Sequence, residues 1–139
     1  MTRMSGLYGG DILTLAGSLR DGTLAAPTGT ARKTAKLCGS EAEVDLRVED
    51  GRIADFAQRI RACALGQASA AILAANVKGA TCAEVRAARD QLHAMLKLDG
   101  DAPEGRFADL AKLREVKSYP ARHASTLLPF EAAVAACGE

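Results

Sequence analysis

The 139-residue sequence has no tryptophan, only 4% aromatic residues, and a formal net charge of +1. Proteins that bind nucleic acids usually carry a basic surface and aromatic side chains that stack on bases, so this composition argues against nucleic-acid binding. The sequence also lacks an apolar run long enough to cross a bilayer and lacks a secretory leader. We therefore expect no membrane association.

Motifs of common enzymes are missing as well. The sequence has no HExxH element, no phosphate-binding loop, and no serine, histidine and aspartate order typical of hydrolases. We therefore expect a protein without enzymatic turnover. The four cysteines are irregularly spaced, which favours a reducing cytoplasm and predicts no structural disulfide. Cys82 and Cys137 are expected to be bystanders.

The contents of apolar residues (48%) and charged residues (25%) are typical of one globular domain, which we assign to residues 1–139. Val44, Leu46 and Val48 alternate with charged residues, as burial of one face of a sheet requires, and Asp50-Gly51 suits a tight turn. The pattern predicts three antiparallel strands. They cover residues 32–38, the stretch around 44–48, and residues 52–62.

Helices are predicted before and after these strands, because apolar residues recur there at helical spacing. Thr81 and Glu84 have the spacing of a capping box, in which each side chain satisfies a free amide at the helix start. Pro129 lacks an amide donor and is expected to kink or restart the last helix. The predicted helices cover residues 12–19, 63–79, 81–96, 107–113 and the segment after Pro120. We predict an α+β fold in which a three-stranded antiparallel sheet packs against four to five helices.

Two cysteines flank the predicted strands. Cys38 ends the first strand, and Cys63 opens the helix after the third. A hairpin between them returns its second strand to where its first began, so the two thiols are expected to meet. The helix start favours the thiolate form of Cys63, and thiolates bind iron, zinc or iron–sulfur clusters.

Other interpretations of this pair stay open. Free cysteines are often small buried hydrophobes, so Cys38 and Cys63 are alternatively core residues. A redox protein that uses a disulfide between them is a further alternative, although the pair lacks Cys-x-x-Cys spacing.

The segment 119–130 indicates a third site position. Pro120, Arg122, Leu128 and Phe130 match the pattern Pro-x-Arg-x-x-Cys-x-x-Leu-x-aromatic. With these residues the chain resembles the iron–sulfur scaffold family of the NifU N-terminal domain, IscU and SufU, and its SufU branch in particular. Where this pattern has the family's third cysteine, the chain has Ser125.

The resemblance implies a fold like that of IscU and the NifU N-terminal domain, and a role as a divergent iron–sulfur cluster assembly scaffold or sulfur acceptor. Such a protein would bind iron, zinc or a cluster through Cys38 and Cys63, with Cys63 favoured over Cys38 as the persulfide acceptor. Its partners would be a cysteine desulfurase and acceptor apo-proteins, and a homodimer is compatible with this role. IscU uses a histidine beside its third cysteine, which makes His123 a candidate metal ligand. The alternative is that His123 is a solvated residue on the helix surface.

The differences from the family pattern favour a second function. The family sequence Cys-Gly-Asp is Cys38-Gly39-Ser40 here, and the third cysteine is replaced. The chain is therefore alternatively a degenerate relative, which binds one metal ion or a protein partner in a regulatory role without assembling clusters.

Overall fold

The computed structural model describes residues 9–138. Three strands are followed by a helical half, and one helix precedes them, which confirms the predicted α+β class. In chain order the elements are α2 (Gly10–Ser18), β1 (Gly29–Ala35), β2 (Ser40–Glu49), β3 (Arg52–Arg61), α3 (Ala64–Asn76), α4 (Cys82–Lys97), the 3₁₀ segments η1 (Gly105–Ser118) and η2 (Pro120–Arg122), and α5 (His123–Ala136).

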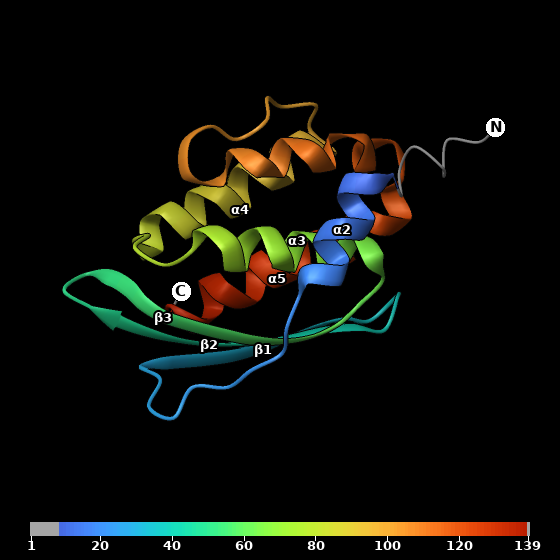
Figure 1. Cartoon of the computed structure of the whole chain (residues 1–139). Coiled ribbons are helices and arrows are strands. Elements are labelled where there is room, and N and C mark those ends of the chain that lie inside the picture. Colours follow the sequence, from blue (N-terminus) through green and yellow to red (C-terminus); the bar gives the residue numbers. More distant parts are fainter. Residues whose placement is uncertain (1–8, 139) are drawn as a thin grey trace.

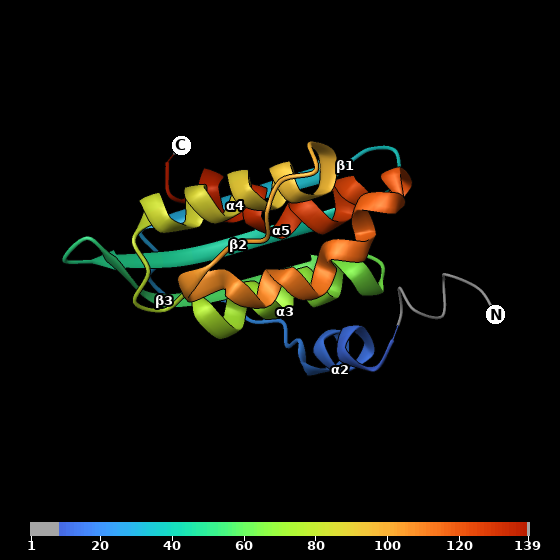
Figure 2. The same cartoon turned by 90° about the horizontal axis from the view of Figure 1, so that it is seen from above.

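The strands form one antiparallel sheet in the order β1-β2-β3. Asp50 and Gly51 have φ values of 53° and 78°, so the predicted turn between β2 and β3 uses two left-handed residues. All of the helices lie on one side of the sheet (Figure 1). Seen from above, α3, α5 and α4 lie beside one another over the strands (Figure 2). Apolar and charged residues alternate along β2 because only one face of the sheet is covered by helices.

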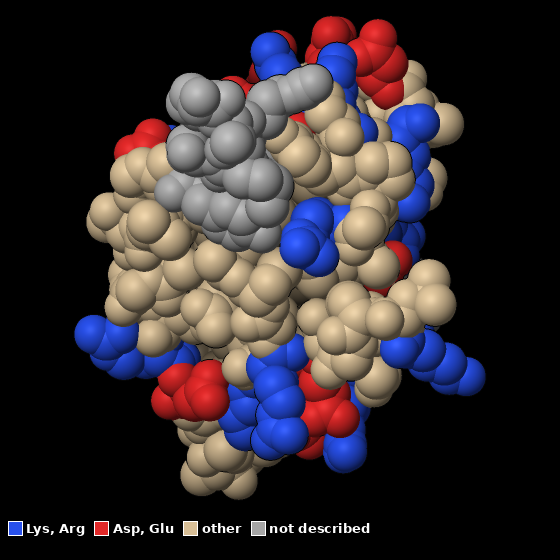
Figure 3. Space-filling model, turned by 90° about the vertical axis from the view of Figure 1, so that its right-hand side faces the viewer, with Lys and Arg blue, Asp and Glu red and all other residues tan. Residues whose placement is uncertain are grey.

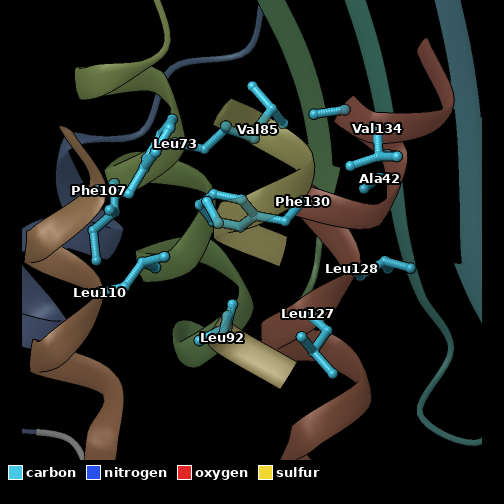
Figure 4. Packing of buried hydrophobic residues seen from close by; sticks show 14 of the residues in the cluster. Ala42, Leu73, Val85, Leu92, Phe107, Leu110, Leu127, Leu128, Phe130 and Val134 are labelled. Atoms are coloured by element: carbon cyan, nitrogen blue, oxygen red, sulfur yellow. The ribbon is translucent and has the colours of Figure 1, made fainter. Parts of the chain in front are cut away.

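The core lies between this covered face and the helices. Phe130 of α5 is fully buried at its centre, and its ring meets that of Phe107 edge to face, with centroids 5.7 Å apart. Leu92 and Leu110 approach the same ring from α4 and η1, and Ala42 lies on the sheet side (Figure 4). This packing fixes α5, whose first turns carry the predicted third site position.

The other face of the sheet carries a polar cluster around Asp45 and Arg59. The Arg59 guanidinium donates to both carboxylate oxygens of Asp45 at 3.0 and 3.1 Å, and its Nε donates to Glu43 at 3.1 Å. The segment before β1 closes over this cluster, since the Leu24 amide donates to Asp45 and the Gly22 carbonyl accepts from Arg59. The pKa of Asp45 is held below its usual value, mainly by the hydrogen bonds from Arg59.

Two helix predictions differ from the structure. Helix α5 continues through Pro129 to Ala136, so the predicted restart of the helix is wrong, while the predicted kink stays a prediction. Pro129 cannot donate to the Ser125 carbonyl four residues earlier, and the helix continues without that hydrogen bond. The predicted helix over 107–113 is part of the longer segment η1, whose backbone departs from helical geometry at Phe107.

The cysteines differ from expectation as well. Strand β1 ends at Ala35, so Cys38 lies in the turn before β2 rather than at the end of a strand. Cys82 and Cys137 form a disulfide, which contradicts the prediction that none is present. Spacing along the chain could not reveal this pair, because only the packing of α4 on α5 brings the two residues together. None of the helices between residues 9 and 138 has the length and apolar content needed to span a membrane.

Candidate functional site

The β1–β2 turn and the start of α3 lie at the same end of the sheet. Ala35 pairs with Ser40 across the turn, and Glu41 pairs with Arg61 at the end of β3. Cys38 is in this turn, and Cys63 is the N-cap of α3. Helix α5 also begins at this end of the molecule (Figure 1). The register thus brings both cysteines to one end of the sheet, and a direct meeting of the two thiols stays a prediction.

Cys38 is exposed and hydrogen-bonded to a serine. Its Sγ lies 3.2 Å from the Oγ of Ser40, which is itself buried at the start of β2. The Ser40 hydroxyl holds the pKa of the Cys38 thiol below its usual value, and the positive charge of Arg122 acts in the same direction more weakly. The turn thus presents an accessible thiol whose thiolate form is favoured.

Cys63 is partly buried and contacts a second serine. Its Sγ lies 3.4 Å from the Oγ of Ser125, a residue that is only 2% exposed. The Ser125 hydroxyl also donates to the Arg122 carbonyl at 3.2 Å. The position that the sequence pattern assigns to a third cysteine is therefore in direct contact with Cys63, although 62 residues separate the two.

Gly66 makes this contact possible. A Cβ atom at Gly66 would lie 3.0 Å from the Ser125 carbonyl oxygen and 2.7 Å from the Cβ of Ala62. Helix α3 can therefore approach α5 this closely only with glycine at position 66. Gly66 is not among the residues predicted from the sequence, although a single glycine in the first turn of an alanine-rich helix is a recognisable signal of close helix packing.

His123 is 5% exposed, so the alternative of a solvated surface histidine is wrong. Its Nε2 lies 3.0 Å from the Val116 carbonyl oxygen and 3.2 Å from that of Lys117. Carbonyl oxygens only accept hydrogen bonds, so Nε2 carries a proton and is not available to a metal in this arrangement. A ligand role for His123, which stays a prediction, would require Nδ1 or a turned ring.

The donor set fits a soft metal in part. Two thiols can be reached from outside, but the third position offers a hydroxyl, which is a poor ligand for iron or zinc compared with a thiolate. Among residues 9–138, no group of three or more histidine, cysteine, aspartate or glutamate side chains is arranged to hold a metal ion. That Cys38 and Cys63 hold a metal or cluster stays a prediction.

Charged residues do not form a uniform field over this end of the molecule. Figure 3 faces it, and shows lysine and arginine side chains interspersed with uncharged residues, while acidic side chains lie mostly toward the edges. Leu37, next to Cys38 in the turn, is fully exposed. The surface around the thiols is thus mixed in character, which suits contact with a protein better than contact with a polyanion.

Comparison with known proteins identifies the family. The sequence profile of the NifU-like N-terminal domain matches residues 14–126. The chain belongs to the NifU-like N-terminal domain family. The iron–sulfur cluster assembly scaffold protein IscU of Thermotoga maritima is 28% identical over 85 residues, which are 61% of this chain and 59% of that protein. The match thus spans less than two thirds of this relative. The scaffold family predicted from the sequence is confirmed.

Solved structures of NifU-like proteins confirm the predicted fold. The N-terminal part of a nitrogen-fixing NifU-like protein from Brucella abortus has a TM-score of 0.94 and 49% identity, and the match covers 97% of this chain and 94% of that one. A putative SUF-system scaffold protein from Fervidobacterium islandicum has a TM-score of 0.86 and 21% identity, with 96% and 98% covered. At this lower identity the second likeness shows the fold alone, so the predicted closeness to the SufU branch has weak support.

Proposed function

We propose that this chain takes part in iron–sulfur cluster assembly, as a scaffold or sulfur acceptor that acts through Cys38 and Cys63. The observation that carries the proposal is the contact of 3.4 Å between Cys63 Sγ and Ser125 Oγ. It places a retained cysteine against the position of the third cysteine of the family pattern, within a chain that belongs to the NifU-like family. A relative of the chain is named an assembly scaffold protein, which supports the expectation that the chain would bind its cargo without turning it over.

Sulfur would arrive as a persulfide on a cysteine desulfurase. A thiolate of the scaffold attacks the outer sulfur of that persulfide, the S–S bond of the donor breaks, and the donor leaves as a thiolate. The sequence favours Cys63 as the acceptor. In the structure, however, Cys63 is partly buried, whereas Cys38 is exposed and its pKa is lowered by Ser40. These properties support Cys38 as the thiol that reacts first, with Cys63 as the second site residue.

Iron would then join the sulfur on the two thiolates. The cargo is an iron–sulfur cluster or iron, and zinc is the other soft metal that such ligands bind. With Ser125 in the third position, and His123 turned toward the carbonyls of Val116 and Lys117, water would complete the coordination. We expect weak and rapidly exchanging metal binding, which suits a site that passes its cargo on to acceptor apo-proteins.

The remaining features of this proposal follow from the family. The desulfurase and the acceptor proteins would contact the mixed surface around Cys38, in the cytoplasm, without nucleic acid or membrane. Residues 1–139 would act as one domain, and a homodimer is compatible with the free surface at this end.

A second function is favoured by the two serines. Ser40 and Ser125 occupy the positions where the family pattern has aspartate and cysteine, and each is hydrogen-bonded to one of the retained cysteines. A degenerate relative that binds one metal ion or a protein partner without building clusters would have such a site.

Anaerobic reconstitution with iron, cysteine and a desulfurase tests the proposal. Absorption spectra and metal analysis would compare the wild type with Cys38→Ser/Cys63→Ser, and Cys82→Ser/Cys137→Ser serves as a matched control that removes the same number of sulfur atoms elsewhere. A cluster chromophore that forms in the wild type and in the control, but not in Cys38→Ser/Cys63→Ser, supports the scaffold. No chromophore in any of the three proteins overturns it in favour of the degenerate relative.

The substitution Ser125→Cys tests the third position directly. It places a thiol beside Cys63 without a large change in side-chain volume, and a third thiolate should strengthen zinc or iron binding by at least tenfold. Competition with a chromogenic chelator would measure the change. Unchanged affinity would mean that position 125 does not face the metal.

A further inference from the structure

The second cysteine pair lies away from the site just described. Cys82 is the first residue of α4, and Cys137 directly follows the last residue of α5. Their Cα atoms are 6.0 Å apart, and the two residues are joined although 55 positions separate them in sequence. Both are partly buried against the hydrophobic core. This inference rests on the cytoplasmic setting proposed above, because disulfides in reducing compartments are usually transient or redox-sensing rather than permanently stabilising.

The fold keeps the pair together without help from the bond. At Gly29 of β1, a Cβ atom would lie 1.9 Å from the Ala136 carbonyl oxygen, so the end of α5 is tightly seated on the sheet. Val134 and Ala136 are buried beside it, and Val85 of α4 is fully buried one turn after Cys82. When the bond is reduced, the backbone at both cysteines should therefore stay in place, and the two thiols should remain near enough to re-form it.

The pair is also separate from the site thiols. Cys63 contacts Ser125 in the first turns of α5, whereas Cys137 lies at the other end of the same helix. Twelve residues of helix at a rise of 1.5 Å each span roughly 18 Å, too far for direct exchange between the two pairs. Cys38 and Cys63 are each hydrogen-bonded to a serine hydroxyl, and both are free.

We propose that Cys82 and Cys137 form a reversible thiol–disulfide site, which reacts with low-molecular-weight disulfides such as oxidised glutathione while Cys38 and Cys63 remain thiols. One thiolate of the pair attacks the small disulfide and releases one thiolate, forming a mixed disulfide. The other thiolate of the pair then attacks the protein sulfur of this mixed disulfide and releases the second small thiolate. Two protein thiols are oxidised and one small disulfide is reduced to two thiols, so electrons balance. The bond ties the end of α5 to the start of α4.

A disulfide within the protein forms more readily at this pair than a mixed disulfide forms at a single thiol. A thiol without a second thiol in contact forms a mixed disulfide, which free reduced glutathione readily reverses, and the contact found for the Cys38 thiol is with the Ser40 hydroxyl. In the Cys82–Cys137 pair, the second thiol is already in contact and displaces the small thiol. The pair should therefore become oxidised under milder conditions than either site cysteine.

The full chain, reduced and then equilibrated anaerobically in glutathione buffers of fixed total concentration, tests this proposal. Acid quenching, alkylation and peptide mass spectrometry would report each cysteine separately. We expect the 82–137 link to reach half-formation with at least tenfold less oxidised glutathione than any mixed disulfide on Cys38 or Cys63. The link should disappear on adding dithiothreitol and re-form when it is removed, with a rise in melting temperature of roughly 5–10 °C on oxidation.

Matched variants separate this pair from the site. Cys38→Ser/Cys63→Ser should oxidise at residues 82 and 137 as the wild type does, whatever the outcome of the cluster reconstitution. Cys82→Ser should leave Cys137 in a mixed disulfide only. Because the reduced wild type is compared with the oxidised wild type, the test does not depend on a variant that folds. Prior oxidation of Cys38 or Cys63, or failure of the 82–137 link to form reversibly, would overturn the proposal.

Discussion

Replacing Gly66 by alanine should destabilise the protein, although alanine is the better helix former. Gly66 lies in the first turn of α3, where the helix passes Ser125. The new methyl group would meet the Cβ of Ala62 at 2.7 Å and the Ser125 carbonyl oxygen at 3.0 Å. Both distances are shorter than a normal van der Waals contact, and neither atom is the flexible end of a side chain. Helix α3 would therefore have to move away from α5.

The magnitude follows from two opposing effects. Overpacking of a well-packed site costs typically about 1–3 kcal/mol. Replacing glycine by alanine within a helix contributes about 0.5–1 kcal/mol in the other direction. The free energy of unfolding should therefore fall by roughly 1–2 kcal/mol. Movement of α3 would also separate Cys63 from Ser125, so metal retention should fall more than stability alone explains.

The same substitution at Gly17 provides the control. Gly17 lies near the end of α2, and no atom beyond its neighbours would come within 4 Å of an added Cβ. Gly17→Ala should therefore raise stability by about 0.4–1 kcal/mol. Urea denaturation followed by circular dichroism would measure both variants. If Gly66→Ala proved as stable as the wild type, close packing at Ser125 would not be what requires glycine there.

Two further substitutions test particular interactions. Asp45→Asn removes the carboxylate that accepts from Arg59, and should cost about 1–3 kcal/mol at neutral pH. Because the pKa of Asp45 is lower in the folded than in the unfolded protein, this stabilisation is present above the unfolded value near 4 and is lost as the pH falls through the folded value. The stability difference between wild type and variant should therefore shrink toward pH 3, and a constant difference would contradict this assignment. His123→Ala leaves the carbonyls of Val116 and Lys117 without a donor, and should cost about 1–3 kcal/mol in urea denaturation whether or not metal is present. A loss of zinc affinity without loss of stability would instead make His123 a ligand.

The strands could be predicted from the sequence because their alternation of apolar and charged residues has one cause, the burial of one face of the sheet. The alternation in β2 reflects one covered face, and Asp50-Gly51 occupies the two positive-φ positions of the turn. The capping box of Thr81 and Glu84 is present with both hydrogen bonds, at 2.9 and 3.1 Å. These features depend on neighbours within a few residues, and such local interactions are visible in a sequence.

Features that depend on distant partners were missed. Strand β1 begins at Gly29 rather than at residue 32, because pairing with Leu46 of β2 extends it. Helix α5 passes through Pro129, and Leu128 and Phe130 on either side of the proline are buried against residues of other elements. The 82–137 disulfide likewise exists only because α4 packs on α5. In each case the deciding group is far away in the sequence.

The site shows the same division. The motif around Pro120 identified position 125, and the hairpin argument placed both cysteines at one end of the sheet. The orientation of His123 was not predictable, because it is set by two carbonyls at the end of η1 that bind its Nε2. Identity and spacing of residues thus indicated which positions lie together at this end of the sheet, but not which ring nitrogen of His123 meets the two carbonyls.

The two serines have a consequence for how such a site would handle its cargo. A thiolate in the third position would carry negative charge and bind iron strongly, whereas the Ser125 hydroxyl stays neutral and contacts the Cys63 sulfur instead. Ser40 likewise replaces the aspartate of the family pattern with a neutral group, and it hydrogen-bonds to Cys38. Both changes lower the negative charge around the metal position while keeping the two sulfur nucleophiles. Sulfur acceptance needs only the thiols, but stable iron binding needs the charge and the third ligand. Under the proposed function, such a site would therefore be better suited to receiving sulfur than to retaining a finished cluster.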